Sequence, residues 1–466
     1  CLAAKVAIEK YNVLHLMLTI GIILVGVTTY ILSGEKGLLL NFMMMVGMLH
    51  VDSKRVIRLA GYLWGATFGV RVIISLFDMQ DTVYKVHDKL GLGYIFRWSL
   101  GYSHPNVLHV SYLLLAALII LILGNKCKLW HLGSLLLGNI VIFLYSVSYT
   151  GFIIVMALLL GRLFLMIHSN LLWIEKGLWA LVVPACAGIS IIGPLVLTDG
   201  YLHYKLNIIT NTRLWLTQQF LKPEYIHLWG NRLSEITTNA LTMDNAYVFA
   251  FIIYGIVPFC ITIGITIYTV IQLLRQNRII EVLVILVIGI GGITEPFLYN
   301  TSFKNISFIY MGEMLFCTEN EKEKIGILAK YNKMISFSKT RILKGKEIIK
   351  DVTLLTWKKL IVAACAGTLA LLASHGVMSY PDGYVVRRSD CEDRPKIFHY
   401  YDVESGFENY KEMVEFEPGE KVEYFSGNIV KVEKVRNNVM IFLLVSTGSY
   451  LLCGAGENLR KAKRRA

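Results

Sequence analysis

The residues of this chain that could do chemistry lie in three polar segments, each beside long apolar stretches. The first segment runs from Arg97 to Asn106 and contains His104, a side chain that can accept or donate a proton near neutral pH. Asn106 comes directly before an apolar stretch, so it is a candidate both for binding a polar substrate and for capping a helix. A hydrogen-bonded His104 beside such a cap is the structural alternative to a catalytic base.

The second segment is the longest and combines arginines, an acid and aromatic rings. Arg213 is followed closely by Trp215, Arg232 ends the tetrapeptide Trp-Gly-Asn-Arg, and Asp244 and Asn245 precede the next apolar stretch. Aromatic faces suit sugar rings, and the guanidinium fork suits phosphate oxygens. An aromatic belt at a membrane surface, with arginines that reach toward water, explains the same pattern. The sequence leaves these two interpretations open.

The third segment contains Glu295, in the tripeptide Thr-Glu-Pro where a helix is expected to end. Glu295 can pair with one of the arginines, and an exposed glutamate at a helix end is the alternative. Arg71 lies inside an apolar stretch, near one end of it. An ionised group at membrane depth is costly and usually faces a cavity or a partner, so Arg71 is predicted to contact an anion.

The motifs of several other chemistries do not occur in the sequence. There is no Walker loop, no GxGxxG, no HExxH and no CxxC pair, and no acidic motif for a metal-bound diphosphate stands in the segments described above. We therefore expect a reaction that needs no cofactor, no nucleotide and no metal.

The elements that must position these residues are predicted to be membrane helices. Hydrophobic residues make up 55 % of the chain, charged residues 17 %, and the mean hydropathy is +0.55. A span needs about 20 apolar helical residues. We expect an all-α polytopic membrane protein with about twelve transmembrane helices. Its spans are predicted at 13–32, 38–50, 59–77, 107–123, 129–147, 150–167, 178–197, 246–274, 279–297, 302–316, 360–373 and 440–453.

The charged residues predict the side on which each loop lies. Short loops rich in Lys and Arg stay in the cytoplasm. Even numbers of spans separate three such loops, so they fall on one side: residues 54–58, 126–128 and 275–278. Segments 78–106 and 198–245, which hold most of the candidate residues, then lie outside. These basic loops also explain the net charge of +13, so we expect no nucleic-acid partner.

The chain is predicted to have three parts. Residues 1–316 form the membrane core, and residues 317–357 form a basic cytoplasmic linker, either an amphipathic helix on the inner leaflet or a solvated segment. Residues 358–466 form a membrane hairpin with a basic cytoplasmic tail. Its external segment, 377–437, alternates apolar and polar residues as strands do, and we expect a small β-rich unit there.

Taken in order, the polar segments resemble those of bacterial O-antigen, capsular and exopolysaccharide polymerases, which are related to O-antigen ligases. The resemblance covers residues 13–316. The segments that carry it are Gly101-Tyr102-Ser103-His104-Pro105-Asn106, residues 146–151, Asn211-Thr212-Arg213-Leu214, Asp244-Asn245-Ala246-Tyr247, Tyr254-Gly255-Ile256, and Thr294-Glu295-Pro296 with Asn300 and Asn305.

The resemblance implies a glycosyltransferase in the bacterial cytoplasmic membrane with its active site facing outside. The donor it implies is a growing glycan on a polyprenyl diphosphate lipid. The acceptor is a sugar hydroxyl of a new lipid-linked oligosaccharide repeat unit. The lipid bilayer and other polysaccharide assembly proteins are the further expected partners.

In that reaction, cations stabilise the departing diphosphate and a base takes the hydroxyl proton. His104 is the first candidate for the base and Asp244 the second. The arginines predicted to contact the diphosphate, with the second choice last, are Arg97, Arg213, Arg232 and Arg71. The remaining residues predicted to bind substrate are Asn106, Asn245, Glu295 and Trp215.

Two features depart from the resemblance and keep other functions open. The family often has Ser-Arg-Thr-Gly where this chain has Tyr149 in place of the arginine, and the hairpin 358–466 lies outside the resemblance. A transporter or flippase of lipid-linked sugars would also need arginines, together with broken helices and polar groups at mid-membrane. A non-catalytic scaffold for polysaccharide assembly is the third alternative.

Overall fold

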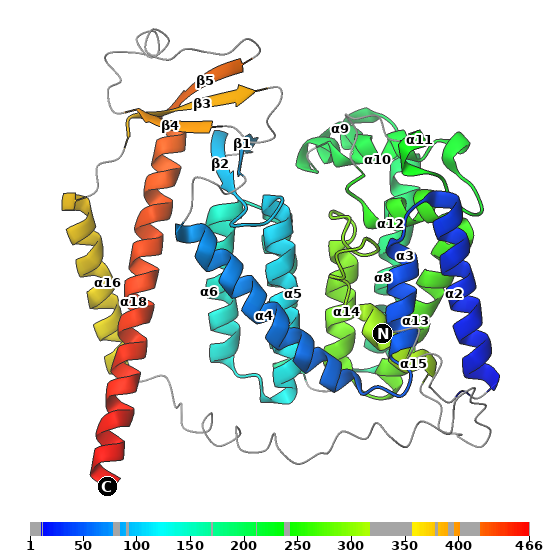
Figure 1. Cartoon of the computed structure of the whole chain (residues 1–466), viewed down its shortest axis with the longest axis horizontal. Helices are drawn as coiled ribbons and strands as arrows, with labels where there is room; N and C mark the ends of the chain where they lie inside the picture. The colour runs from blue at the N-terminus through cyan, green and yellow to red at the C-terminus, as the bar shows by residue number, and fades with distance from the viewer. Residues whose placement is uncertain are drawn as a thin grey trace. The chain divides into compact units, whose positions relative to one another are not determined.

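A computed structural model describes the helices and strands of most of the chain (Figure 1). Most of the linker predicted at 317–357 lies outside the described residues. The structure describes residues 11, 13–77, 84–89, 93–168, 171–210, 212–236, 243–316, 357–377, 381–389, 396–400 and 420–465.

The described part of the chain is mainly helical, and seven of its helices are long and apolar enough to cross a membrane. They are α2 (Val13–Ser33), α4 (Ser53–Phe77), α5 (Pro105–Leu123), α6 (Leu129–Ser146), α7 (Tyr149–Ile167), α8 (Trp173–Val196) and α13 (Ile256–Arg275). The helices in the other predicted spans are α3 (Gly37–Gly47), α14 (Ile279–Gly291), α15 (Ser307–Phe316), α16 (Trp357–Val377) and α18 (Asn428–Arg465). The prediction of an all-α polytopic membrane protein is confirmed, whereas twelve spans remain a prediction.

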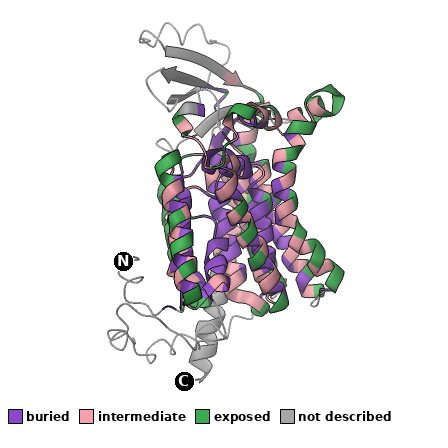
Figure 2. Cartoon of the chain, turned by 90° about the vertical axis from the view of Figure 1, so that its right-hand side faces the viewer, coloured by how far each residue is buried: buried purple, intermediate pink, exposed green. Residues whose placement is uncertain are grey.

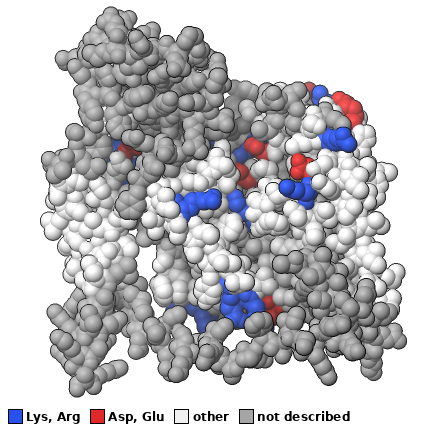
Figure 3. Space-filling view, in the orientation of Figure 1, with Lys and Arg blue, Asp and Glu red and all other residues white. Residues whose placement is uncertain are grey.

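The exposed surface of these helices is largely apolar, as expected for contact with a lipid bilayer. Many exposed side chains are large and apolar, for example Leu59 and Ile73 on α4 and Leu181 on α8. Figure 2 colours the described residues by burial, and exposed residues, in green, recur along the helices. The described surface in Figure 3 is mostly uncharged, and its acidic and basic residues form a few small groups. A water-soluble protein rarely exposes so much apolar surface, so these helix faces are suited to contact lipid.

The helices and strands form two compact units. Unit 1 consists of residues 1–70, 109–140 and 148–336, and unit 2 consists of residues 71–108, 141–147 and 337–466. Unit 2 therefore joins residues of the predicted core to the C-terminal hairpin.

In unit 1, α14 is buried almost throughout and packs against α7. Two glycines show the direction of this packing. A Cβ on Gly161 would lie 2.4 Å from Leu283, and one on Gly291 would lie 3.4 Å from Ile154. The two helices are therefore antiparallel, and α7 begins at the end of the unit where α14 stops.

The three basic loops predicted to share one side do lie at one end of unit 1. Arg278, before α14, donates to Ser53 at the start of α4, and residues 54–58 form the first turns of this helix. Near the end of α7, Arg162 donates to Gly124 O, beside loop 126–128. Because α7 and α14 are antiparallel, these contacts all lie at the end opposite Thr150 and Gly291.

One predicted span is a broken helix. It consists of α12 (Ala246–Phe249), a five-residue π-helical turn from Ala250 to Tyr254, and α13. Gly255 separates the turn from α13 with a φ of +92°. The side chain of Asn231 donates to Ile252 O, and its backbone N–H donates to Ile253 O. These two carbonyls at the break therefore have hydrogen-bond partners within the protein.

Unit 2 contains the described strands. β1 (Tyr84–Lys89) and β2 (Gly93–Trp98) form an antiparallel hairpin. β3 (Gly383–Ser389) pairs antiparallel with β4 (Lys396–Tyr400) and β5 (Glu420–Ser426), in the order β4-β3-β5. α16 packs along α18, and Phe96, Tyr384 and Ile429 form a buried cluster between β2, β3 and the start of α18. The segment predicted to be β-rich thus contains strands.

Candidate functional site

The main polar site of unit 1 is a guanidinium group between two carboxylates. Arg213 Nε donates to Asp244 Oδ2 at 3.2 Å, and one Nη donates to Glu295 Oε1, also at 3.2 Å. Thr150 Oγ1 donates to the same Glu295 oxygen at 3.2 Å. Three residues predicted from different parts of the sequence therefore meet in space, together with a fourth that was not among the candidates.

Arg213 is the first residue of α10 (Arg213–Phe220), a short helix fixed by hydrogen bonds to its neighbours. The residue before it, Thr212, has a φ of +63°, which sets the direction in which α10 starts. Gln218 donates to the carbonyls of Pro194 and Leu197 at the end of α8, where helical carbonyls lack partners within their own helix. These bonds hold α10 at the end of α8 and so place Arg213.

Asp244 is placed by the start of α12. Asn245 caps this helix, since its side-chain oxygen accepts from the amides of Tyr247 and Val248. The amide of Ala246 donates to Gly292 O, and the Tyr247 hydroxyl donates to Gly289 O. These bonds tie the start of α12 to the end of α14. Asn245, predicted to bind substrate, thus has a structural role that positions its neighbour Asp244.

Glu295 lies in the loop between α14 and α15. Its amide donates to Gly291 O, which continues the last turn of α14. The rest of the loop is fixed at Tyr299, whose carbonyl accepts from Asn41 and from the hydroxyl of Tyr254. Thr150 lies in the first turn of α7, where the helix dipole favours a carboxylate. The loop therefore holds Glu295 against the start of α7.

The two carboxylates have different environments. The side chain of Asp244 is 35 % exposed, whereas that of Glu295 is 8 % exposed. Burial raises the pKa of Glu295 above its usual value, although the charge of Arg213 opposes this and the charge of Asp244 adds to it. With both acids ionised, the three side chains carry a formal charge of −1. Asp244 is the carboxylate that a substrate in water can reach.

A buried histidine, His109, packs against the start of α7 next to Thr150. His109 Nε2 lies 2.7 Å from Asn139 Oδ1, and Asn139 Nδ2 donates to Phe152 O. The His109 ring packs on Gly151, where an added Cβ would lie 2.6 Å away. His109 and Asn139 stand inside apolar stretches and gave no sign of this role. Thr150, by contrast, lies in a segment that carries the family resemblance.

Unit 2 gathers a second set of predicted residues. The buried side chain of Arg97 donates from Nε to Ser146 O at 2.8 Å and from Nη2 to Asn106 Oδ1 at 2.7 Å. His104 Nδ1 accepts from the amide of Asn106. A neutral His104 with this bond carries its proton on Nε2, so the ring can donate a hydrogen bond but has no lone pair left to act as a base.

The remaining predicted residues are more exposed. Arg71 lies in unit 2 with its guanidinium over the ring of Tyr102, 4.9 Å from the centroid. In unit 1, Arg232 and Trp215 are exposed, and the amide of Trp215 donates to Asn207. Arg71, Arg232 and Trp215 therefore remain accessible to a ligand.

In the described part of the chain, no group of three or more His, Cys, Asp or Glu side chains could hold a metal ion. Comparisons of the whole chain with protein-family models, with curated proteins and with solved structures find no match. The function must therefore be inferred from the geometry of the site and from the resemblance of its segments.

Proposed function

We propose that this protein is a membrane glycosyltransferase that polymerises polyprenyl-diphosphate-linked oligosaccharide repeat units into a surface polysaccharide. The arrangement of Asp244, Arg213 and Glu295 is the observation that carries this proposal. It supplies a water-accessible carboxylate beside a guanidinium group, which is what joining a sugar hydroxyl to a diphosphate-activated sugar requires.

In the proposed reaction, the oxygen of an acceptor hydroxyl attacks the anomeric carbon of the donor sugar. The bond from that carbon to the diphosphate oxygen breaks, and the lipid diphosphate leaves with the bonding electrons. Asp244 takes the hydroxyl proton. Buried Glu295 holds Arg213 in place, and Arg213 fixes the orientation of Asp244 through Nε.

The charges of the site limit what Arg213 can do alone. Two carboxylates already surround it, so the group has no excess positive charge for a dianionic leaving group. The Nη of Arg213 that does not contact Glu295 makes no hydrogen bond with a described residue and can donate to one phosphate oxygen. We assign the main diphosphate contact in unit 1 to exposed Arg232, because it has no ion-pair partner among the described residues.

The residues of unit 2 take different roles from those first expected. His104 has its Nδ1 engaged by the amide of Asn106, so we propose that it donates from Nε2 to a phosphate or sugar oxygen. Asp244 then replaces it as the base. Arg97 is buried and bonded to Ser146 and Asn106, which supports a positioning role, whereas exposed Arg71 remains a candidate cation.

The basic loops support a site that faces outward, and the membrane we propose is the bacterial cytoplasmic membrane that the resemblance implies. They lie at the end of unit 1 opposite Glu295, and the positive-inside rule assigns that end to the cytoplasm. We propose that the shorter helices α3, α14 and α15, with α16 and α18, also span, which gives about twelve. The C-terminal strands then form the external β-rich segment.

The broken helix at Gly255 is the observation that favours the alternative of a transporter, because transporters bind substrates at such breaks. Here the groups freed by the break already have partners within the protein. Ile252 O and Ile253 O accept from Asn231, and the first amides of α13 donate to His227 O and Leu228 O. Because these groups are already hydrogen-bonded, we propose that the break is structural and does not bind a substrate.

Reconstitution of the full chain in liposomes with a purified lipid-linked repeat unit tests the proposed function. We expect a ladder of lengthened products without added nucleotide or metal. Movement of the lipid between leaflets without lengthening would select the transporter, and neither activity would select the scaffold.

Asp244→Asn should abolish the ladder. The matched control is Glu313→Gln, because Arg278 also lies between two carboxylates, Glu281 and Glu313, at the opposite end of the unit. Glu313→Gln should retain the ladder. Equal loss in both variants would show that the Asp244 site has no special role in elongation.

A further inference from the structure

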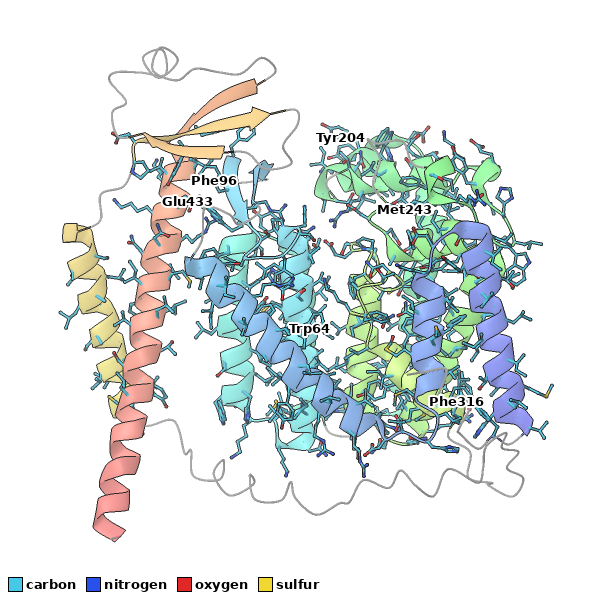
Figure 4. All side chains as sticks on the ribbon, viewed as in Figure 1. Trp64, Phe96, Tyr204, Met243, Phe316 and Glu433 are labelled. Atoms are coloured by element: carbon cyan, nitrogen blue, oxygen red, sulfur yellow. The ribbon has the colours of Figure 1, made fainter. Side chains whose placement is uncertain are left out.

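The C-terminal hairpin contains a charged side chain that is almost completely buried. Arg436 on α18 is 2 % exposed, and it pairs with Glu433 one turn earlier on the same helix. Figure 4 shows Glu433 close to Phe96, where α18 passes β2. A buried ion pair is costly to desolvate and contributes little stability by itself. The other contacts of Arg436 therefore indicate what it does.

Arg436 links three elements of unit 2. Nε donates to Leu144 O in the last turn of α6 at 2.7 Å, and Nη2 donates to Phe96 O in β2 at 3.0 Å. The guanidinium also lies over the ring of Tyr145, 5.5 Å from its centroid. The last carbonyls of a helix lack intrahelical partners and carry partial negative charge, so they bind a guanidinium well.

Arg97 binds the same two elements from the adjacent position. It follows Phe96 in β2, and its Nε donates to Ser146 O, two residues beyond the carbonyl that Arg436 binds. Its Nη2 then holds Asn106, whose amide donates to His104. A continuous set of hydrogen bonds thus runs from α18 through β2 and the end of α6 to the His104 loop.

We infer that Arg436 is a positioning residue through which the C-terminal hairpin holds Arg97 and the His104 loop in their working arrangement. The buried cluster of Phe96, Tyr384 and Ile429 joins the same parts by apolar contact. The hairpin, which lies outside the family resemblance, therefore supports the His104 loop within unit 2. This inference rests on the proposed function, in which His104 contacts the substrate.

The test compares Arg436→Met with a matched variant in the full-length protein. Arg162→Met is the control, because Arg162 is also buried and also donates to a carbonyl near a helix end, but in unit 1 at the end opposite Glu295. We expect Arg436→Met to lower kcat for elongation at least tenfold. Arg162→Met should leave kcat within about twofold, whatever its effect on thermal unfolding. Arg436→Lys should restore part of kcat, because an ammonium can donate to one of the two carbonyls.

A second measurement does not depend on activity. Ser103 is exposed beside His104, so Ser103→Cys reports on this loop, and its labelling by a membrane-impermeant maleimide is followed by mass spectrometry of the peptide. Arg436→Met should change the labelling rate severalfold, and Arg162→Met should not.

A labelling rate and a kcat that match those of Arg162→Met would overturn the role of Arg436. If the wild-type protein makes no polymer, the proposed function fails, but the labelling rates still decide whether Arg436 positions the loop.

Discussion

Arg213 and Arg278 each lie between two carboxylates, at opposite ends of unit 1. Arg213 contacts Asp244 and Glu295, whereas Arg278 contacts Glu281 and Glu313. The two clusters differ in what surrounds them. The Arg278 guanidinium lies over the ring of Tyr310 and donates to Ser53, so it joins α14, α15 and α4. In the Arg213 cluster, the side chain of Asp244 is 35 % exposed, compared with 18 % for Glu281 and 19 % for Glu313. This difference in access to water predicts different results on mutation.

Replacing each arginine with Met tests whether the Arg213 cluster is catalytic and the Arg278 cluster is structural. Arg213→Met should lower the elongation rate on the order of 10²–10³-fold, the usual effect of removing one group that orients or stabilises a transition state. Arg278→Met should lower the thermal unfolding temperature but leave the rate per folded molecule nearly unchanged. Product ladders normalised to folded protein provide the measurement, and similar rates in the two variants would contradict the assignment.

Glu295 should control the acidic limb of the pH profile. Burial raises its pKa, so as the pH falls Glu295 becomes neutral earlier than an ordinary glutamate and releases its ion pair with Arg213. We therefore expect elongation to decline at a pH above the usual carboxyl range. Glu295→Gln should be slower at neutral pH and should lack this limb. An unchanged limb in the variant would assign the titration to another group.

The raised pKa of Glu295 should affect stability and activity in opposite directions as the pH falls. The folded state binds the Glu295 proton more tightly than the unfolded chain does, so its contribution is fully present below the unfolded pKa and is lost as the pH rises through the folded pKa. Wild-type protein should thus gain stability relative to Glu295→Gln on mild acidification, while its activity falls. Thermal unfolding measured across the same pH range separates the two effects.

Two mutations should separate the two roles of His104, which are to cap the start of α5 and to donate a hydrogen bond to the substrate. Its Nδ1 accepts the Asn106 amide near the start of α5, a contact that an asparagine side chain can reproduce. His104→Ala should cost about 1 kcal/mol of stability, the typical value for a lost cap. His104→Asn should recover the stability but not the elongation rate. Full activity in His104→Asn would show that only the cap matters.

The glycine at the helix break, Gly255, should contribute to the stability of the folded protein. A Cβ there would lie 2.3 Å from the Gly230 amide nitrogen, and the φ of +92° is unfavourable for any other residue. Gly255→Ala should destabilise the protein by about 1–3 kcal/mol. The control is Gly264→Ala in the same helix, where no atom lies within 4 Å of the added Cβ. It should be neutral or stabilising, because Ala favours helix.

The sequence predicted the helices well because apolar length is a local property. Each of the twelve predicted spans contains a helix in the structure. The common end of the basic loops was also predictable, since charge and span order determine it. The break at Gly255 was not predicted, because it depends on contacts with Asn231, far away in sequence.

The residues of the candidate site could be predicted from the sequence, but their contacts could not. Arg213, Asp244 and Glu295 were identified from residue type and segment order, and a pairing of Glu295 with an arginine was expected. The state of His104 depends on its bond to Asn106, and the burial of Arg97 depends on the end of α6, so neither could be read from type. Arg436 had no motif, and its role follows from packing alone.

The most direct test of the account counts the lipid diphosphate released for each repeat unit added. In liposomes that contain the wild-type protein and the lipid-linked repeat unit, one polyprenyl diphosphate should appear for every unit joined, and Asp244→Asn should release none while remaining folded. Lipid that changes leaflet with no release of diphosphate, or release that continues unchanged in Asp244→Asn, would contradict the proposal that Asp244 serves a glycosyl transfer.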